Sequence, residues 1–372
     1  MRIGIDIRCL MEKNYSGVCI YTRELLKAIF EADHENNYIL FYNSAQESKV
    51  PKFDHQNVSV FENTIPNKIF NASIKFFQKP HIDELVGGLD VLFLPNIQFV
   101  SVSEKCKIIT TIHDISFERY PEFYTVRARL WQGAVDPKNL CKKSRRIISV
   151  SQNTKNDLVD IYGIAKEKIQ VIYSGISDSF RPITDMGLLD AVKKKYFLPE
   201  DFVLYLGNLE PRKNIDSIIE VFLKKMIPQD THLVIAGANA WKYKRLHSMA
   251  MKLKQRIHCI GYVEEEDKSA LYSLSKVFLY PSYYEGFGFP PLEAMACGAP
   301  VIASNISSLP EITNNASILI DPYNINDIAR ALNALLNDLE ARKIFIERGL
   351  RRSSQFRWNN SARETIKAFH SI

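Results

Sequence analysis

The sequence lacks the short patterns that mark disulfide-rich, zinc-binding and membrane-spanning proteins. Its six cysteines are scattered, without CxxC or Cys/His metal spacing, which favours free thiols in a reducing compartment. No apolar run approaches the roughly 18 residues that a membrane span needs. The first residues, MRIGIDIRCL, indicate a β-strand and lack the basic head and cleavage site of a signal peptide. We therefore expect a cytoplasmic protein.

Two further absences bear on the chemistry. No Asp-x-Asp occurs in the chain, which disfavours enzymes that hold a phosphorylated substrate through Mn²⁺ or Mg²⁺. Neither half offers a GxGxxG followed by an acid at the ribose position, which disfavours a dinucleotide-dependent dehydrogenase. We therefore expect neither a bound metal ion nor another cofactor.

The composition is that of a globular protein with an excess of positive charge. The chain has 372 residues, of which 46% are hydrophobic and 24% charged, and this length suggests two domains. The formal net charge of +6 suits an anionic partner without naming one. No nucleic-acid-binding module accompanies the charge, so we expect no nucleic-acid partner.

Basic residues gather in two stretches of the first half. One stretch, 127–146, holds Arg127, Arg129, Lys138, Lys142, Lys143, Arg145 and Arg146. The other, Asn67–Pro80, mixes three lysines with Phe70, Phe76 and Phe77. Two interpretations stay open: solvated helix faces with the aromatic rings turned to the core, or a patch that contacts an anionic membrane surface.

Apolar, strand-like runs alternate with amphipathic, helix-length stretches almost throughout, which predicts parallel sheets with helical crossovers. The pattern begins at Arg2–Asp6, continues with a helix from near Gly17, and restarts at Phe202–Leu206, with Tyr173–Pro199 as the linker. Further expected strands are Tyr38–Tyr42, Val58–Phe61, Val91–Leu94, Lys107–Ile112, Arg146–Val150, Lys168–Ile172, His232–Ala236, Ile257–Ile260, Val277–Tyr280, Pro300–Ser304 and Ser317–Ile320, and expected helices of the second series are Ile215–Met226, Lys242–Gln255, Glu265–Ser273, Pro290–Ala296 and Asn326–Leu336. The predicted fold class is α/β, with two Rossmann-like domains and a ligand cleft at the carboxyl ends of their strands.

The most informative stretch is Leu279–Asn305, LYPSYYEGFGFPPLEAMACGAPVIASN. A strand ends at Tyr280, a loop with Gly286 and Gly288 follows, and a helix opens at Pro290. Loop glycines let backbone N–H groups approach a ligand, and a helix N-terminus favours an anion. This pattern is typical of a site for phosphate and hydroxyl groups.

Two acids belong to the same stretch. Glu285 lies in the loop and Glu293 is expected in the first helical turn, so both can reach a ligand held above the strand ends. The alternative for Glu293 is a purely local role, in which it stabilises the helix N-terminus.

A second stretch, Leu204–Asn214 (LYLGNLEPRKN), combines a strand, a turn at Gly207 and the pair Arg212-Lys213 before a helix that Asn214 can cap. Two adjacent cations at the carboxyl end of a strand can clamp a diphosphate without a metal ion. A solvated basic turn is the alternative.

The first half offers two shorter candidates. Gly17, in Ser16–Thr22 (SGVCIYT), follows the first strand at a point where glycine lets a diphosphate or sugar press against the backbone. His113 and Asp114, in Ile108–Phe117 (IITTIHDISF), stand at the end of a buried strand. A polar pair there is a candidate site, and a hydrogen-bonded core histidine is the alternative.

Taken together, these stretches resemble the GT-B-fold glycosyltransferases of family 4. The match rests on Gly17, on His113-Asp114, on Gly207–Asn214 and on the EGFG-x-PxLEAMA-x-G-x-PV block at Glu285–Val301, and it extends to Ser149–Leu158, Val171–Ile176, Gly261–Val263 and Phe356–Phe369. The resemblance implies an N-terminal, acceptor-side domain at 1–175, joined by a C-terminal helix at 356–372, and a donor-binding domain at 176–355.

In the second domain, the resemblance implies that Arg212 and Lys213 hold the diphosphate of a nucleotide-sugar donor and stabilise its charge as the glycosidic bond breaks. Glu293 is expected to accept hydrogen bonds from the ribose hydroxyls, and Glu285 to contact the donor sugar. The other implied donor-binding residues are Asn208, Tyr262, Val263, Gly286, Phe287 and Gly288.

In the first domain, the resemblance implies that Gly17 admits the diphosphate, that His113 lies near the transferred sugar and acts in catalysis, and that Asp114 lies on the acceptor side. The loop departs from the family pattern, because Ser16 stands where a second glycine is usual. Family members retain the anomeric configuration, so neither Glu285 nor Glu293 is expected to act as a nucleophile.

The segments HDISFERYPEFY and SSLPE look most like the bacterial branch that builds O-antigen and capsule. They imply transfer of a hexose, with mannose from GDP-mannose as the leading donor, to a saccharide or a lipid-linked saccharide at the inner face of the cytoplasmic membrane. The alternatives are another donor (UDP- or dTDP-linked; glucosyl, N-acetylglucosaminyl, rhamnosyl or fucosyl transfer), a non-catalytic binding protein, or an epimerase-type enzyme that would need further cleft carboxylates.

Overall fold

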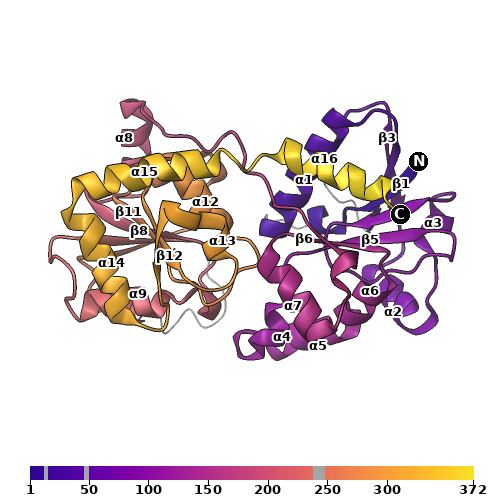
Figure 1. Ribbon diagram of the computed structural model, residues 1–372, viewed down its shortest axis with the longest axis horizontal. Coiled ribbons are helices and arrows are strands. Elements are labelled where there is room, and N and C mark those ends of the chain that lie inside the picture. Colours follow the sequence, from indigo (N-terminus) through magenta and orange to yellow (C-terminus); the bar gives the residue numbers. More distant parts are fainter. Residues whose placement is uncertain (12–15, 46–49, 238–247) are drawn as a thin grey trace. The chain divides into compact units, whose positions relative to one another are not determined.

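The computed structural model describes residues 1–11, 16–45, 50–237 and 248–372. The chain divides into two compact units: unit 1 is Met1–Gly175 with Arg357–Ile372, and unit 2 is Ile176–Phe356 (Figure 1). Each unit is a parallel α/β domain, and the predicted fold class is confirmed in this respect.

Unit 1 contains a seven-stranded sheet in the order β3-β2-β1-β4-β5-β6-β7, with every described pairing parallel. The order reverses between β1 and β4, so the carboxyl ends of the central strands form a topological switch point, where such folds bind ligands. The strands are β1 (Arg2–Asp6), β2 (Asn37–Asn43), β3 (Val58–Asn63), β4 (Val91–Leu94), β5 (Lys107–Ile112), β6 (Arg146–Ser149) and β7 (Ile169–Val171).

Helices cover both faces of this sheet (Figure 1). They are α1 (Gly17–Ala32), α2 (Asn67–Phe77), α3 (Ile82–Leu85), α4 (Ser116–Arg119), α5 (Val126–Val135), α6 (Pro137–Lys143), α7 (Gln152–Tyr162) and α16 (Trp358–His370), with short 3-10 turns at Arg8–Met11, Pro121–Phe123 and Lys166–Lys168. The C-terminal helix α16 lies beside α1 in Figure 1 and packs against it.

The contacts of α16 show how the end of the chain joins unit 1. Phe369 packs its ring on that of Phe93 on β4, with centroids 5.4 Å apart. The Ser361 hydroxyl donates a hydrogen bond of 2.6 Å to the carbonyl of Tyr173. A Cβ on Gly175 would lie 2.2 Å from the backbone nitrogen of Trp358, so only glycine permits this close crossing of the two chain segments.

Unit 2 repeats the design with a six-stranded parallel sheet in the order β10-β9-β8-β11-β12-β13. Its switch point lies between β8 and β11. The strands are β8 (Phe202–Leu206), β9 (His232–Ala236), β10 (Ile257–Gly261), β11 (Val277–Tyr280), β12 (Val301–Ser304) and β13 (Ser317–Ile320).

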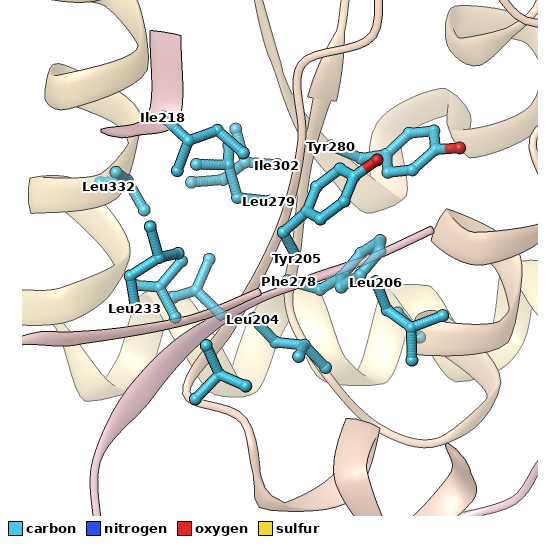
Figure 2. Close-up of a cluster of buried hydrophobic side chains, with 14 of the residues drawn as sticks. Leu204, Tyr205, Leu206, Ile218, Leu233, Phe278, Leu279, Tyr280, Ile302 and Leu332 are labelled. Atoms are coloured by element: carbon cyan, nitrogen blue, oxygen red, sulfur yellow. The ribbon is translucent and has the colours of Figure 1, made fainter. Parts of the chain in front are cut away.

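The core of unit 2 forms because both faces of the sheet are covered. Helices α9 and α14 pack together on one side, whereas α8, α11, α12 and α15 form a connected layer. Figure 2 shows Leu204 and Phe278 of the central strands among the aliphatic side chains of this core, and both are fully buried. Burying such a side chain stabilises the fold by about 1.5–3 kcal/mol. The helices are α8 (Met186–Lys195), α9 (Ile215–Leu223), α11 (Lys268–Leu274), α12 (Phe289–Ala296), α13 (Leu309–Thr313), α14 (Ile325–Asn337) and α15 (Leu339–Ser353), with 3-10 turns at Pro211–Lys213, Glu265–Asp267 and Asn314–Ala316.

The structure corrects two predictions about the organisation of the chain. The expected linker Tyr173–Pro199 contains α8, and from Ile176 onward it belongs to unit 2. Phe356, expected at the start of the C-terminal helix, lies in unit 2, and α16 begins at Trp358. The expected helix Lys242–Gln255 falls partly on 238–247, outside the described residues.

The basic and aromatic stretch on α2 divides into two environments. Phe70 is fully buried, which agrees with the interpretation that the aromatic rings face the core. Phe76 and Phe77 do not agree with it, because they are 76% and 75% exposed. All six cysteines are free thiols, and Cys259 is the exposed one among them. In the described parts of the chain, no helix is both long and apolar enough to cross a bilayer.

Candidate functional site

The loop after β8 places two cations at the carboxyl end of the central strand. The 3-10 turn Pro211–Lys213 carries them, and Asn214 follows in the left-handed region, at φ 56°. Asn214 stands at the N-cap position of α9, but its side chain does not cap the helix as predicted. Its amide donates to the carbonyl of Pro322 at 2.7 Å, which ties the loop to the segment after β13.

Arg212 and Lys213 meet two carboxylates from two loops. The Lys213 ammonium lies 2.6 Å from Oε1 of Glu285, and the Arg212 guanidinium lies 3.2 Å from its Oε2. Arg212 also contacts Glu210 at 2.7 Å and donates to the carbonyl of Tyr284. Two cations and two carboxylates therefore form one compact cluster at the switch point of unit 2.

Burial sets the electrostatics of this cluster. Lys213 and Glu285 are only 8% and 6% exposed. Burial lowers the pKa of Lys213, the charge of Arg212 lowers it further, and Glu285 opposes both effects. Burial alone would raise the pKa of Glu285, but Arg212 and Lys213 outweigh it and bring that pKa to about 2. Glu285 is consequently ionised throughout the physiological pH range.

Neutral side chains complete the environment of Lys213. Its ammonium donates to the Tyr280 hydroxyl at 2.6 Å, and the Ser282 hydroxyl donates to Oε1 of Glu285 at the same distance. The ring of Tyr280 stacks on that of Tyr205, with centroids 6.0 Å apart. Figure 2 shows both phenol oxygens at one end of the core, pointing the same way. The hydrophobic core thus holds the hydroxyl that positions Lys213.

The glycine loop after β11 is also built into the protein. Gly286, Phe287 and Gly288 are buried, and the Ser308 hydroxyl donates to the carbonyls of Glu285 and Phe287 at 2.9 and 2.7 Å. Gly288 has φ +114° and directly precedes α12. Because side chains rarely adopt this backbone conformation, glycine is required to start the helix here.

Glu293 lies one turn later than predicted. Helix α12 begins at Phe289, so Glu293 is its fifth residue and does not belong to the first turn. Its Oε2 accepts a 2.8 Å hydrogen bond from the Tyr272 hydroxyl, and it is 5% exposed. Burial raises the pKa of Glu293, although Lys268 and Tyr272 oppose the shift. A buried carboxylate in the second turn does not fit the alternative of a helix-end charge.

The charge of Lys268 interacts with Glu293 and with Tyr262, which follows β10. Burial lowers the pKa of Lys268, but Glu293 and Glu265, with a smaller contribution from Tyr262, raise it by more. The net shift of this pKa is therefore upward. Tyr262 follows β10 and is 60% exposed, whereas Val263 is buried. Asn208, after β8, is exposed as well.

Unit 1 brings two of its predicted residues to neighbouring elements. Gly17 is the exposed first residue of α1, and Tyr21, one turn later, packs edge-on against the ring of His113 at 4.6 Å. His113 directly follows β5, and its Nε2 lies 2.9 Å from the carbonyl oxygen of Pro95, after β4. Burial lowers the pKa of His113, and the hydrogen bond to Pro95 opposes the shift.

The contact with the Pro95 carbonyl fixes the tautomer of the neutral histidine. A neutral imidazole that donates from Nε2 to a carbonyl has its lone pair on Nδ1. His113 can therefore accept a hydrogen bond from a ligand at Nδ1.

Asp114 has a local contact that the sequence interpretation did not foresee. Its Oδ1 accepts hydrogen bonds from the backbone N–H of Ser116 at 2.9 Å and from the Ser116 hydroxyl at 2.5 Å. These bonds fix the turn between β5 and α4.

Sequence reasoning missed several residues that build the site. Tyr280, Ser282 and Glu210 contact the cations or Glu285, and Tyr272 and Lys268 contact or charge-stabilise Glu293. Tyr280, Ser282 and Glu210 belong to the two sequence motifs of unit 2, and their place in those motifs could have identified them. Within the described ranges, no group of three or more His, Cys, Asp or Glu side chains is placed to hold a metal ion.

Solved structures with the same architecture define the fold of the protein. Sucrose-phosphate synthase from Thermosynechococcus elongatus superposes with a TM-score of 0.78 at 20% identity, covering 100% of this chain and 98% of that one. Anabaena Alr3699/HepE, in complex with UDP and glucose, gives 0.75 at 17% identity, with both chains fully covered. WaaG, a glycosyltransferase involved in lipopolysaccharide biosynthesis, gives 0.72 at 16% identity and 99% coverage of both chains. The fold is GT-B, that of a large class of glycosyltransferases.

Sequence comparisons then give the family. Residues 15–180 match the family described as Glycosyltransferase Family 4, and residues 190–352 match Glycosyl transferases group 1. The O-antigen chain mannosyltransferase B of Escherichia coli is 31% identical over 370 residues, which are 95% of this chain and 96% of that protein. The O-antigen chain mannosyltransferase RfbU of Salmonella typhimurium is 30% identical over 214 residues, 57% of this chain and 56% of that protein. The chain belongs to glycosyltransferase family 4, as the sequence resemblance predicted.

Proposed function

We propose that this glycosyltransferase moves mannose from GDP-mannose, with retention of anomeric configuration and without a metal ion, to a saccharide or lipid-linked saccharide acceptor in the synthesis of an O-antigen type surface polysaccharide. The observation that carries the proposal is the buried cluster of Arg212, Lys213 and Glu285 at the switch point of unit 2. The choice of mannose rests on relatives named O-antigen mannosyltransferases, one of which spans the chain almost end to end.

The cations neutralise the departing diphosphate in this proposal. Arg212 offers a planar fork of N–H donors and Lys213 a compact charge, and both are held within 3.2 Å of Glu285 before any donor binds. Charges that are already oriented in a low-dielectric site stabilise a developing negative charge without a reorganisation cost. A divalent ion is then not needed for this role.

The neighbouring groups bind the rest of the donor. Glu285 accepts hydroxyls of the transferred sugar, with the backbone N–H groups of Gly286, Phe287 and Gly288 beside it. Glu293 accepts the ribose hydroxyls, because a buried carboxylate with one oxygen on Tyr272 keeps further acceptor capacity. Asn208, Tyr262 and Val263 complete the donor contacts, the last two at the base.

Unit 1 supplies the acceptor side. Gly17 presents bare backbone at the start of α1 to the diphosphate, and the Nδ1 of His113 accepts a hydroxyl of the transferred sugar. Asp114 orders the turn that faces the acceptor. Retention follows when the acceptor attacks from the face that the phosphate leaves, with the phosphate taking the acceptor proton. Glu285, ionised and held by two cations, is then not a nucleophile.

A donor panel with and without EDTA tests the proposal. GDP-mannose is expected to raise the melting temperature of the protein more than GDP-fucose, UDP-glucose, UDP-N-acetylglucosamine or dTDP-rhamnose, and EDTA is expected to leave that shift unchanged. A larger shift with another donor would refute the assignment of mannose. Loss of the shift on chelation would refute metal independence.

The affinity for GDP-mannose is expected to fall in mildly acidic solution. Its diphosphate diester does not titrate there, whereas Glu293 has a raised pKa and binds hydroxyls as a carboxylate. As the pH falls through the pKa of Glu293, its carboxylate is protonated and no longer accepts hydrogen bonds from the ribose hydroxyls. The affinity for GDP-mannose is therefore full above this pKa and is lost below it. The loss should begin above the pH at which an exposed glutamate titrates, ~4.3.

Calorimetric titrations between pH 4.5 and 7.5 measure this effect. Glu293→Gln is expected to bind weakly and with a smaller pH dependence than the wild type, because only the protonation of His113, whose pKa lies below its usual value of 6.5, then remains. Glu340→Gln, whose side chain is 75% exposed, should follow the wild type. A wild-type pH profile in Glu293→Gln would show that another group is responsible.

We further propose that unit 1 contacts an anionic membrane surface, where a lipid-linked acceptor would lie. Phe76 and Phe77 on α2 and Leu130 on α5 are at least 70% exposed, and α2 carries Lys68 and Lys75. Exposed aromatic and aliphatic side chains beside lysines suit the interface of an anionic bilayer. Co-sedimentation with phosphatidylglycerol vesicles, reduced in Phe76→Ser/Phe77→Ser, is the expected result. Equal sedimentation with neutral phosphatidylcholine vesicles would contradict it.

A further inference from the structure

Unit 1 contains a cavity of about 1000 Å³ that the proposed function does not use. Its lining includes Lys107, which begins β5, Arg146, which begins β6, and Lys168, which precedes β7. These positions lie at the amino ends of the strands, whereas His113 follows the carboxyl end of β5. A strand of six residues spans about 20 Å. The cavity is therefore separate from the candidate sugar-transfer residues of unit 1.

The charge of the lining is strongly positive. Six basic side chains contribute to it against two acidic ones, Glu104 and Glu167; the basic residues are Lys107, Lys142, Lys143, Arg145, Arg146 and Lys168. They come from five segments, namely β5, α6, the turn that follows α6, the start of β6, and the turn before β7. Since segments far apart in the sequence supply these cations, the concentration of charge is a property of the fold.

Several of these cations have no internal counter-charge. In the described parts of the chain, no ion pair or side-chain hydrogen bond is made by the side chains of Lys107, Lys142 or Arg145. Arg146 donates to the carbonyl of Glu167 at 3.1 Å and to the Ser371 hydroxyl at 3.3 Å, but its buried Nε has no hydrogen-bond partner. A buried donor without a partner is costly and rare in folded proteins.

The remaining basic groups show how crowded the positive charge is. The Lys168 ammonium donates to the carbonyl of Lys142 at 2.6 Å, and its pKa is lowered by burial and by the nearby charge of Arg145. Lys143 is held by the side-chain carbonyl of Gln78 at 3.2 Å. An anion in the cavity would relieve this repulsion.

We propose that this basic cavity is a binding site for a phosphate-bearing ligand, distinct from the nucleotide-sugar site. Phosphate combines multiple charge with several acceptor oxygens and matches the donors of arginine and lysine. The two sources of such a group are a phospholipid headgroup and a soluble diphosphate. Gln78 lines the cavity and directly follows Phe77 at the exposed end of α2. The cavity therefore lies next to the proposed membrane-contact surface, where a phospholipid headgroup could enter it.

Binding of inorganic pyrophosphate, measured by calorimetry, tests the site itself. The wild type is expected to show a cavity site that Lys142→Glu/Arg145→Glu loses or weakens by about tenfold or more, because two cations become anions. Lys213→Met, in the nucleotide-sugar site, is expected to keep the cavity site. Lys252→Glu/Lys254→Glu, an equal charge change on exposed residues of unit 2, is the matched control and should bind as the wild type.

Phosphatidylglycerol vesicles distinguish the two sources. If a headgroup occupies the cavity, Lys142→Glu/Arg145→Glu should sediment less with these vesicles, and pyrophosphate should release the wild type from them. If the ligand is soluble, the double variant loses pyrophosphate binding while vesicle binding stays unchanged. Unaltered affinity and stoichiometry for pyrophosphate in the double variant, with unaltered vesicle binding, would overturn the proposal. The pyrophosphate measurement tests the cavity site even if the protein binds no membrane.

Discussion

Lys213→Met is expected to reduce the rate of sugar transfer by about 10²–10³-fold, the effect of removing one pre-oriented charge donor from an active site. Methionine keeps most of the buried hydrocarbon of the lysine, so the packing against Tyr280 is largely preserved. Only the ammonium group is lost, and Arg212 remains to balance Glu285. Initial rates with a verified donor, together with thermal unfolding to show that the variant is folded, measure the effect.

Lys224→Met is the matched control for this substitution. Lys224 follows α9 in the same unit, is exposed, and forms a surface pair of 2.8 Å with Glu220. Surface pairs contribute about 0–1 kcal/mol, so this variant should transfer sugar as fast as the wild type. Wild-type activity in Lys213→Met would show that the cation does not act on the leaving group.

Glu285→Gln is expected to have two opposite effects. Without ligand, the substitution removes the buried counter-ion of Lys213 and one of the counter-ions of Arg212. Removing one partner of a buried ion pair lowers the stability of a protein by about 3–5 kcal/mol. The diphosphate of GDP can replace the missing negative charge, so GDP should raise the melting temperature of the variant more than that of the wild type. Transfer should nevertheless fall, because the contact between Glu285 and the donor sugar is lost.

Glu220→Gln provides the comparison, since its side chain is 41% exposed and its pair with Lys224 lies at the surface. It should alter neither the melting temperature nor the response to GDP. Equal GDP-induced shifts in Glu285→Gln and in the wild type would contradict the view that carboxylate and diphosphate share the same cations.

Glu285 also acts as a counter-ion in the unliganded protein. Lys213 is 8% exposed, and a charge in that position is costly unless it is paired. Glu285 pairs with Lys213 and Glu210 pairs with Arg212. The Tyr280 hydroxyl accepts from Lys213 and the Ser282 hydroxyl donates to Glu285. The cations are thereby kept charged and oriented until a diphosphate arrives.

Much of the fold could be predicted from the sequence because its determinants are local. Buried parallel strands are continuous apolar runs, and those expected at Arg2–Asp6, Phe202–Leu206 and Val277–Tyr280 have the same bounds in the structure. The helix α8 was missed because glycine and prolines surround a short amphipathic segment. Composition alone then indicated a linker.

The site was predictable where neighbouring residues in the sequence are also neighbours in space. The adjacency of Arg212 and Lys213 is a sequence fact, but their meeting with Glu285, more than 70 residues later, depends on the pairing of β8 with β11. The failure of Asn214 to cap α9 is also explained by contacts of its side chain: its Oδ1 accepts the Ser217 hydroxyl at 2.6 Å instead of a backbone N–H, and its Nδ2 donates to the carbonyl of Pro322. Tyr272 and Lys268, on a different helix from Glu293, left no local signal at all.

A crystal structure of the complex with GDP-mannose tests the central claim most directly. The account predicts that the Lys213 ammonium and the Arg212 guanidinium lie within about 3.2 Å of the diphosphate oxygens, the range of a hydrogen bond, with no metal ion between protein and phosphate. A divalent ion bridging the phosphates, or both cations still turned to Glu285 and Glu210 and away from the donor, would contradict it.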